Sequence, residues 1–259
     1  MLKASLHVHI KGDHDDYIEY TGFELLDRAH ALGYDIIAFT CHERVVFNEE
    51  LQAHAKNLGI LLIPGIEINV EGHILVLNAH PMTQFIKTPE ELRAYRIEHP
   101  ESFTIAAHPF FPKRKFCLQE RIYKHLDLLD GIELSWFYSK MIDWNKKAKA
   151  LAERVERPYI ATSDIHLLEQ LENGHVIVDC EKNIESFIEA LRNKQFKSIA
   201  KPQGVFQMWW TFGKMLATQM KRFLPWSPPH IIFEHEKLSR QHQSQSQRST
   251  KTDRVSRSV

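Results

Sequence analysis

Two histidines, His7 and His9, stand one residue apart in the first apolar run of the sequence, SLHVHIKG. In an extended strand, alternate side chains point to the same side, so the two imidazole rings would lie together. A strand that served only to pack a core would carry aliphatic side chains at both positions. The histidine pair therefore predicts that the end of this strand belongs to a functional site.

Further histidines and carboxylates follow other apolar runs, at the point where each run ends. They are His42 after IIAFTC, Glu67 in PGIEI, His108 after TIAA, and Asp164 and His166 after YIATS, whereas His73 lies near the start of its run. Taken singly, each has a structural explanation as a packed rim residue, an ion-pair partner or a helix cap. Together they would form a buried cluster of unpaired polar groups, which is costly unless a metal ion binds them.

The ligand types narrow the choice of metal. Imidazole and carboxylate without thiolate favour zinc, manganese or iron over an all-oxygen magnesium or calcium site. The candidate ligands outnumber the roughly four to six positions of one ion, which predicts two or three divalent ions, with Glu67 able to bridge two of them. The acidic loop that follows the first strand adds Asp13, His14, Asp15 and Asp16, which a solvated surface loop explains equally well.

Such a site needs a fold that brings many strand ends together. Strand-like runs are predicted at 3–10, 34–41, 59–68, 72–79, 102–108, 131–136, 158–164 and 174–180. Helix-like segments lie between most of them, at 22–32, 47–58, 89–98, 119–129, 140–156 and 184–194. The alternation predicts an α/β domain of the size of a (β/α) barrel, in which active sites lie at the C-terminal strand ends. An open doubly wound sheet is the alternative, but no glycine-rich nucleotide-binding loop supports it.

Composition excludes several classes of partner and location. Lysine plus arginine equals aspartate plus glutamate, 33 each in 259 residues, which disfavours a long nucleic-acid track. The three cysteines, Cys41, Cys117 and Cys180, lie far apart, which suits a reducing cytoplasm and offers no thiolate zinc site. No apolar run approaches the length of a membrane span, and no secretory signal is evident at the N-terminus.

The composition changes after the last predicted barrel unit. The segment 205–226 contains three of the five tryptophans, and one helical stripe collects Phe206, Trp209, Phe212, Leu216 and Phe223. A terminal helix that packs on the barrel is expected, with peripheral membrane contact through this basic amphipathic segment as the alternative. The predicted organisation is a barrel at 1–201, a helical extension at 202–234 and a disordered, basic, Ser/Gln-rich tail at 235–259.

Residues 3–200 resemble the PHP family, which is named for polymerase and histidinol phosphatase. The resemblance rests on six segments that occur in the order typical of the family: LHVHIKGD, AFTCH, GIEI, GHILVL, AAHP and TSDIH. The resemblance implies a distorted, TIM-like (β/α)7 barrel, a trinuclear metal centre and phosphoester hydrolysis. It implies that His7, His9 and Asp164 bind one ion and that Glu67 bridges to a second, which His73 and His108 complete. His42, His166 and a residue of the acidic loop, Asp13 or else His14, would hold the third.

The predicted function is a metal-dependent phosphoesterase that hydrolyses a small phosphate monoester, a nucleotide or a short oligonucleotide through a metal-bridging hydroxide. Glu67 and Asp164 are the candidate catalytic residues. The candidates for binding substrate phosphate are Lys11, Arg44, Lys113 and Arg114, which solvated rim charges explain equally well. An amidohydrolase-type barrel also begins with an HxH pair, but its metals are usually bridged by a modified lysine. A non-catalytic metal-binding or interaction module is the third alternative.

Overall fold

A computed structural model describes residues 1–221 of the chain, so the predicted disordered tail and the end of the predicted extension lie outside the described residues. One mixed sheet contains every strand of the described part. Its strands are β1 (Leu2–Ser5), β2 (Ile36–Phe39), β3 (Leu61–Asn69), β4 (His73–Leu77), β5 (Phe103–Ala106), β6 (Gly131–Ser135), β7 (Tyr159–Thr162), β8 (Gly174–Val178) and β9 (Phe196–Ala200).

The strand order is β7-β6-β5-β4-β3-β2-β1-β8-β9. Parallel pairs join β1 to β2, β2 to β3, β5 to β6 and β6 to β7. The strand β4 is antiparallel to both β3 and β5, and β8 is antiparallel to both β1 and β9. All the strands of the described part except β4 and β8 therefore run in one direction, so their C-terminal ends gather at one end of the sheet.

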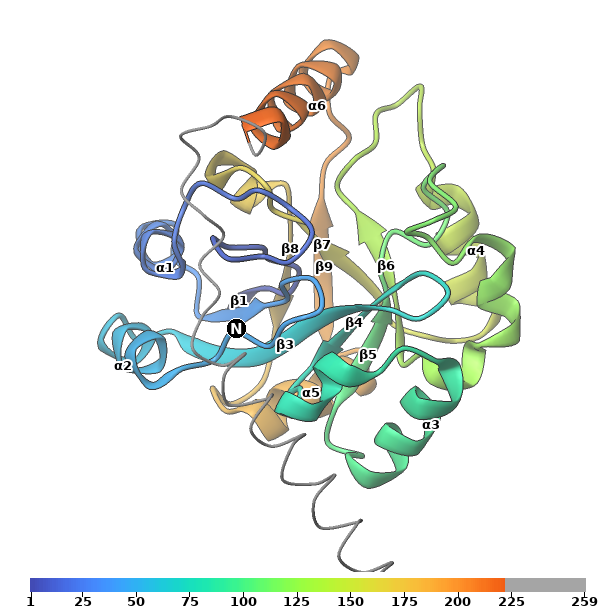
Figure 1. Ribbon diagram of the computed structural model, residues 1–259, viewed down its shortest axis with the longest axis horizontal. Coiled ribbons are helices and arrows are strands. Elements are labelled where there is room, and N and C mark those ends of the chain that lie inside the picture. Colours follow the sequence, from blue (N-terminus) through green and yellow to red (C-terminus); the bar gives the residue numbers. More distant parts are fainter. Residues whose placement is uncertain (222–259) are drawn as a thin grey trace, which may run out of the picture. The chain divides into compact units, whose positions relative to one another are not determined.

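The first and last strands of this order meet. The hydroxyl of Ser198 in β9 donates to the carbonyl of Tyr159 at 2.7 Å and accepts from the amide of Ala161 at 2.9 Å, both in β7. These bonds curl the sheet into a nearly closed barrel, as the ribbon shows (Figure 1). The predicted distorted α/β barrel is confirmed.

Helices cover the outside of the barrel and one of its ends. The α-helices are α1 (Gly22–Ala31), α2 (Glu49–Asn57), α3 (Pro89–Glu98), α4 (Asn145–Arg154), α5 (Ile184–Arg192) and α6 (Val205–Met220), and the 3-10 helices are η1 (Pro81–Phe85), η2 (Gln119–Lys124), η3 (Leu126–Leu128) and η4 (Leu168–Glu172). Thr21 and Thr88 begin α1 and α3 with capping boxes, in which the threonine side chain accepts from the third helical amide. The single helix predicted at 119–129 is two short 3-10 helices instead.

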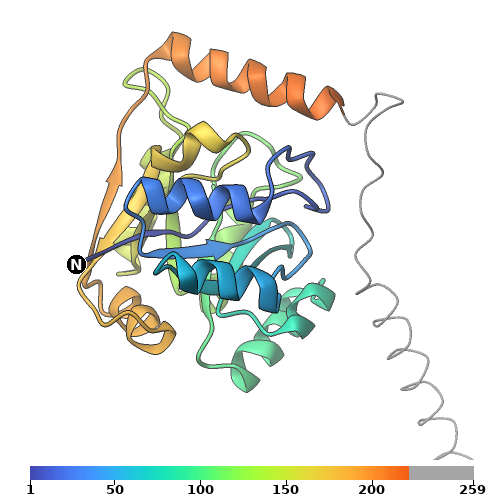
Figure 2. The ribbon, with the colours of Figure 1, turned by 90° about the vertical axis from the view of Figure 1, so that its left-hand side faces the viewer.

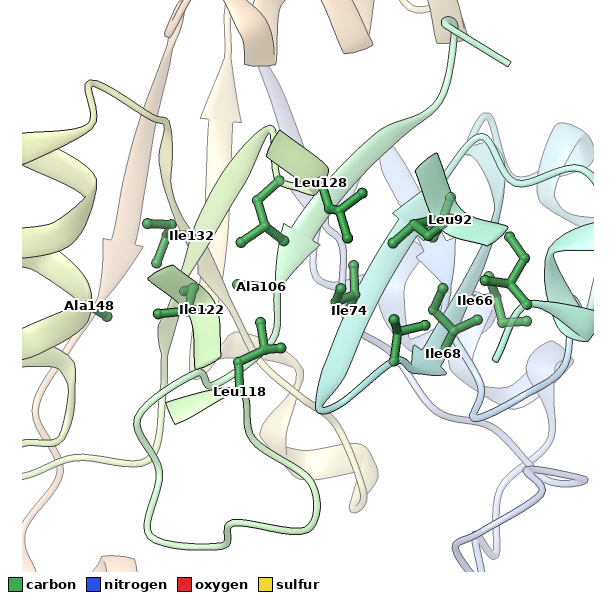
Figure 3. Close-up of a cluster of buried hydrophobic side chains, with 14 of the residues drawn as sticks. Ile66, Ile68, Ile74, Leu92, Ala106, Leu118, Ile122, Leu128, Ile132 and Ala148 are labelled. Atoms are coloured by element: carbon green, nitrogen blue, oxygen red, sulfur yellow. The ribbon is translucent and has the colours of Figure 1, made fainter. Parts of the chain in front are cut away.

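Apolar side chains fill both faces of the sheet. Ala4, Ile36 and Ile63 belong to a buried cluster that reaches from the strands to α5. On another face, Ile74 and Ile132 pack with Leu92 of α3 in the cluster that Figure 3 shows. Burial on both faces explains why several strands are nearly continuous apolar runs rather than alternating ones. None of the described helices is long and apolar enough to cross a membrane.

Gly174, at the start of β8, lies against the end of β7. A methyl group on Gly174 would overlap the carbonyl oxygen of Thr162 and lie 2.6 Å from its carbonyl carbon. Because both neighbouring groups are backbone, we expect Gly174→Ala to lower the free energy of unfolding by about 3 kcal/mol, the upper end of the cost of overpacking. Urea denaturation of the full chain measures this change. Gly213→Ala is the control, since Gly213 has open space around it, and equal effects of the two substitutions would contradict the prediction.

Candidate metal centre

Histidine and carboxylate side chains meet at the end of the barrel where the parallel strands end. Each of five overlapping groups in the described residues offers three ligand atoms within 4.8 Å of one another. They are His7, His108 and Asp164; His7, His9 and Glu67; His9, Asp13 and His42; His9, Asp164 and His166; and His42, Glu67 and His73. The structure thus brings together the histidines and carboxylates that the sequence placed at separate strand ends.

The HxH pair lies in extended backbone directly after β1. His7 and His9 are fully buried, and their ring centroids lie 5.1 Å apart. Leu6 and Val8, which alternate with them, are also fully buried and belong to apolar clusters. The alternation of an extended chain therefore turns both imidazoles into the site while the aliphatic residues pack behind them.

His73 reaches the site because β4 runs against its neighbours. The start of β4 lies opposite the end of β3, where His73 pairs with Asn69, so a residue early in its own strand meets residues late in theirs. The turn that precedes it places Glu71 at φ 57° and Gly72 at φ 149°. A side chain on Gly72 would also lie 2.5 Å from the amide nitrogen of Leu118, so only glycine fits this turn.

Glu67 lies at the centre of the cluster and is almost completely buried. Its Oε1 is 2.7 Å from His73 Nδ1 and 3.3 Å from His108 Nε2. Its Oε2 is 3.1 Å from the Nε2 atoms of both His7 and His42. Burial acts to raise the pKa of Glu67, but the surrounding histidines, His73 first, outweigh it and hold the pKa well below its usual range. An ionised carboxylate with one oxygen toward each half of the cluster suits a bridging ligand.

The acidic loop contributes Asp13 rather than His14. Asp13 is buried, and its oxygens lie 2.8 Å from His9 Nδ1 and 3.0 Å from His42 Nδ1. His14 is exposed and pairs with its neighbour Asp15 at 2.7 Å, outside all the ligand groups. Of the two alternatives that the sequence left open, the structure brings only Asp13 to the cluster. Asp16 joins it as well, with Oδ2 2.9 Å from His166 Nε2.

Asp164 closes the cluster on the side of β7. Its Oδ1 lies 3.4 Å from the Nε2 atoms of both His7 and His9. Burial acts to raise the pKa of Asp164, but the surrounding histidines, His7 first, together outweigh it and hold the pKa well below its usual range. Asp164 and His108 both adopt left-handed backbone conformations, with φ of 41° and 29°. Such strained backbone in residues other than glycine gathers at functional sites, where the surrounding structure holds it in place.

The ligand atoms of the cluster are better placed to bind a cation than to form hydrogen bonds with one another. Buried polar atoms that make no hydrogen bond in the described part of the chain include His9 Nε2, Glu67 Oε1 and both ring nitrogens of His73. The 2.7 Å approach of His73 Nδ1 to Glu67 therefore lacks hydrogen-bond geometry. Leaving such atoms unpaired costs about 1–3 kcal/mol each, which a bound divalent ion would offset. The nitrogen and oxygen ligands without thiolate suit Zn²⁺, Mn²⁺ or iron.

Comparison with known proteins agrees with this geometry. The PHP-associated family matches residues 143–196. A two-domain protein from Bacteroides vulgatus, containing a predicted PHP-like metal-dependent phosphoesterase, superposes with a TM-score of 0.61 at 20% identity, over 83% of this chain and 69% of that one. The resemblance to the PHP family is confirmed.

Other solved structures extend the PHP-like comparison. PsfC from Pseudomonas syringae has a TM-score of 0.61 at 15% identity, over 83% of this chain and 98% of that one. Endonuclease Q, in complex with a 27-mer duplex substrate, has a TM-score of 0.56 at 14% identity, over 78% of this chain and 60% of that one. A 5'-3' exoribonuclease of Haemophilus influenzae is 37% identical over 103 residues, a match that spans 36% of each chain and thus about a third of that protein. At these identities the solved structures establish the PHP-like fold.

Glu133 is a member of the PHP-like site that sequence reasoning missed. It is fully buried in β6, with Oε1 2.7 Å from His7 Nδ1, and it accepts hydrogen bonds from the backbone amide of His108 and the hydroxyl of Thr162. Glu133 therefore holds the Nδ1 side of the His7 ring and the backbone of His108. The available signal was a carboxylate inside the apolar run GIELSW.

We expect Glu133→Ala to lower metal affinity by about 10-fold to 100-fold, the usual effect of removing a group that orients a ligand. The reason is that His7 Nδ1 and the amide of His108 would lose their buried acceptor. Titration of chelator-treated protein with Mn²⁺ measures the affinity. Glu133→Gln, which retains an acceptor oxygen, should lose less than Glu133→Ala, and an unchanged affinity in Glu133→Ala would contradict the role.

A cavity of about 420 Å³ opens onto the cluster. Its lining includes candidate ligands, the ligand wall (His42, Glu67, His73, His108, Asp164 and His166), and aromatic side chains, the aromatic wall (Phe111, Phe116, Trp136, Phe137 and Phe212). Lys113, a predicted phosphate-binding residue, lines the cavity together with Lys115 of the same loop. Lys11, Arg44 and Arg114 are not among the lining residues, and the Arg44 guanidinium donates to the carbonyl of Gly12 at 3.1 Å.

Proposed function

We propose that the protein is a metal-dependent phosphoesterase that acts on a nucleotide, another small phosphate monoester or a short oligonucleotide. The observation that carries the proposal is a cavity lined by candidate metal ligands together with aromatic rings and two lysines. The structural neighbours support the general class, because one contains a predicted PHP-like metal-dependent phosphoesterase and another is an endonuclease.

Two or three divalent ions, of manganese, zinc or iron, would be held by His7, His9, Asp13, His42, Glu67, His73, His108, Asp164 and His166. When bound, such ions supply positive charge for phosphoryl oxygens and a water whose pKa is lowered toward neutrality. Glu67 and Asp164 keep their charge at neutral pH, because the neighbouring histidines hold their pKa values low. We therefore assign both carboxylates to holding cations in place rather than to storing a proton.

The other residues that line the cavity indicate which organic group carries the phosphate. Phe111 packs edge-on against Trp144 and Phe137, with ring centroids 5.0 and 5.6 Å apart, which holds the aromatic wall rigid. Flat aromatic faces bind nucleobases by stacking, without regard to sequence. Lys113 and Lys115 offer positive charge for phosphate oxygens. These contacts favour a nucleotide or a short oligonucleotide over a simple sugar phosphate.

Phosphate release from a panel of monoesters and short oligonucleotides tests the proposal. Protein purified without chelator should contain two or three Mn, Fe or Zn ions per chain and release phosphate from at least one nucleotide. Hydrolysis of amides but not of phosphoesters would support an amidohydrolase instead. Bound metal without turnover of either class would support a non-catalytic metal-binding module, and absence of metal would remove the site altogether.

We also propose peripheral membrane contact through 205–226. The division into a barrel at 1–201 and an extension at 202–234 likewise remains a proposal. The exposed side of α6 carries the large apolar side chains of Phe206, Trp209, Trp210 and Met220. Tryptophan and basic residues suit the membrane interface. The three cysteines are free, which supports a cytoplasmic location for either role.

Sedimentation with vesicles that contain anionic lipid tests the membrane contact. We expect the full chain to sediment with such vesicles and a Trp209→Ala, Trp210→Ala double variant to stay mostly in solution, because each indole supplies much of the apolar area of that face. Neutral vesicles serve as the control for the basic residues. Equal sedimentation of both proteins would reject this role for α6.

A further inference from the structure

The helix α6 lies across the mouth of the PHP-like cavity. Figure 2 shows it running over one end of the barrel, above η4 and the loop that follows β1. Phe212, Met215, Leu216 and Gln219 of this helix line the cavity together with the candidate metal ligands. The apolar stripe of 205–226 was predicted to pack on the barrel, but only part of it does so, because Phe206 and Trp209 are exposed.

Both ends of α6 are held. Near its start, Met208 is fully buried in a cluster with Trp136 and Phe137, two residues of the aromatic wall. Near its end, the Gln219 carboxamide accepts from the amide of Tyr17 at 2.8 Å and donates to the carbonyl of the same residue at 3.4 Å. Lys221 adds an ion pair with Glu19 at 2.8 Å. The helix is therefore a fixed wall of the cavity.

The helix is also tied to the segments that carry candidate ligands. Tyr17 belongs to the loop that brings Asp13 and Asp16 to the site. On the other side, the Gln170 carboxamide oxygen accepts from the amide of His166 at 2.7 Å, and its nitrogen donates to the sulfur of Met215 at 3.2 Å. Movement of α6 would thus disturb both segments, which keeps its distance from the ligand wall constant.

This fixed wall differs in chemistry from the candidate ligands that line the same cavity. Phe212 and Leu216 present apolar groups, while His42, Asp164 and His166 present charge and ring nitrogens. A phosphoester bound here must place its phosphoryl group at the ligand wall and the two lysines, because Phe212 and Leu216 offer it no partners. Its organic group is then left to the aromatic rings and to α6. A volume of about 420 Å³ is near the lower end of the range for small-molecule sites, about 300–1,000 Å³, so the organic group is in contact with both.

We propose that α6 is the specificity-determining wall of the site, with Phe212 and Leu216 contacting the organic group of the phosphoester. The inference rests on the proposed phosphoesterase function and deepens it. The site then selects substrates whose organic group is flat and apolar, such as a nucleobase or an aryl ring. It selects against small hydrophilic esters, which leave the α6 side chains exposed to water.

The test compares three substrates in two variants and one control variant. We expect Phe212→Ala and Leu216→Ala each to lower kcat/KM for p-nitrophenyl phosphate and adenosine 5'-monophosphate about tenfold, the lower end of discrimination by a hydrophobic pocket. For glycerol 3-phosphate, kcat/KM should change by less than about twofold. Trp210→Ala is the matched control, because Trp210 lies on the exposed side of the same helix, and it should leave kcat/KM for all three substrates unchanged. Metal content should be equal in all four proteins.

Three results would overturn the inference without touching the proposed function. The first is wild-type hydrolysis of aryl, nucleotide and glycerol esters with unchanged ratios of kcat/KM in both variants. The second is an equal loss for aryl and glycerol esters, and the third is a loss of metal, because either would show that α6 only supports the ligand segments. If the wild-type protein holds metal but hydrolyses no phosphoester at all, the proposed function fails first and the inference falls with it.

Discussion

His9→Ala is expected to lower phosphate release at least about a thousandfold and to reduce the metal content of the purified protein. His9 belongs to three of the five ligand groups in the described residues, more than any other side chain. Its Nε2 atom lies 3.4 Å from both Glu67 and Asp164, and its Nδ1 atom lies 2.8 Å from Asp13. Loss of one group that stabilises transition-state charge costs about 10²–10³ in rate, and this variant disturbs several.

Elemental analysis and phosphate release, measured on the same preparation, check this expectation. His54→Ala is the matched control, because His54 is a surface residue of α2 that pairs with Asp27 at 2.7 Å, far from any ligand group. It should retain wild-type metal content and rate. A His9→Ala protein that kept full metal content and full activity would contradict the proposed site.

Most of the fold could be predicted because its strands are short apolar runs separated by amphipathic helices. The strand β9 was missed for a physical reason. Its residues, FKSIA, mix apolar, charged and hydroxyl side chains, and the strand is only partly buried, so no continuous apolar run marks it. The segment at 119–129 keeps helical spacing of its apolar residues, but Gln119 begins it with a left-handed φ of 50°, and only 3-10 turns form.

The candidate site was predictable at strand ends and unpredictable where strand direction matters. His73 reaches the site because β4 is antiparallel to its neighbours, and no sequence periodicity reveals strand direction. The choice between Asp13 and His14 depended on the path of one loop. Glu133 was missed because its strand carries no histidine nearby in sequence, and its partners His7 and His108 come from other strands. Contacts that only the tertiary structure brings about cannot be predicted from a local sequence pattern.

Metal affinity is expected to rise about tenfold per pH unit for each proton displaced, between about pH 6 and pH 8. Burial acts to lower the pKa of His7, but nearby carboxylates, Glu67 first, outweigh it and raise the pKa to about 10. The pKa of His9 is likewise raised well above its usual range, chiefly by Asp13 against the effect of burial. Metal ions bind neutral imidazole, so each of these protons must leave. Glu67 and Asp164 are already ionised in this range and add none.

The same shift predicts the opposite trend for the protein without metal. A histidine whose folded pKa is raised contributes stability that is fully present below its ordinary value of 6.5 and is lost as the pH rises through about 10. The Tm of chelator-treated protein should therefore fall between about pH 7 and pH 10, apart from effects of other groups. The gain in Tm on adding Mn²⁺ should instead grow with pH over the lower part of this range, because binding tightens.

Calorimetric titration with Mn²⁺ in two buffers of different ionisation enthalpy counts the protons released. Release of at least one proton per chain at pH 7 is expected, and His9→Ala should release fewer, because one charged imidazole has been removed. His54→Ala should match the wild type. Affinity that does not change with pH, together with no proton release, would mean that these histidines are neutral before metal arrives, and the electrostatic account of the cluster would be wrong.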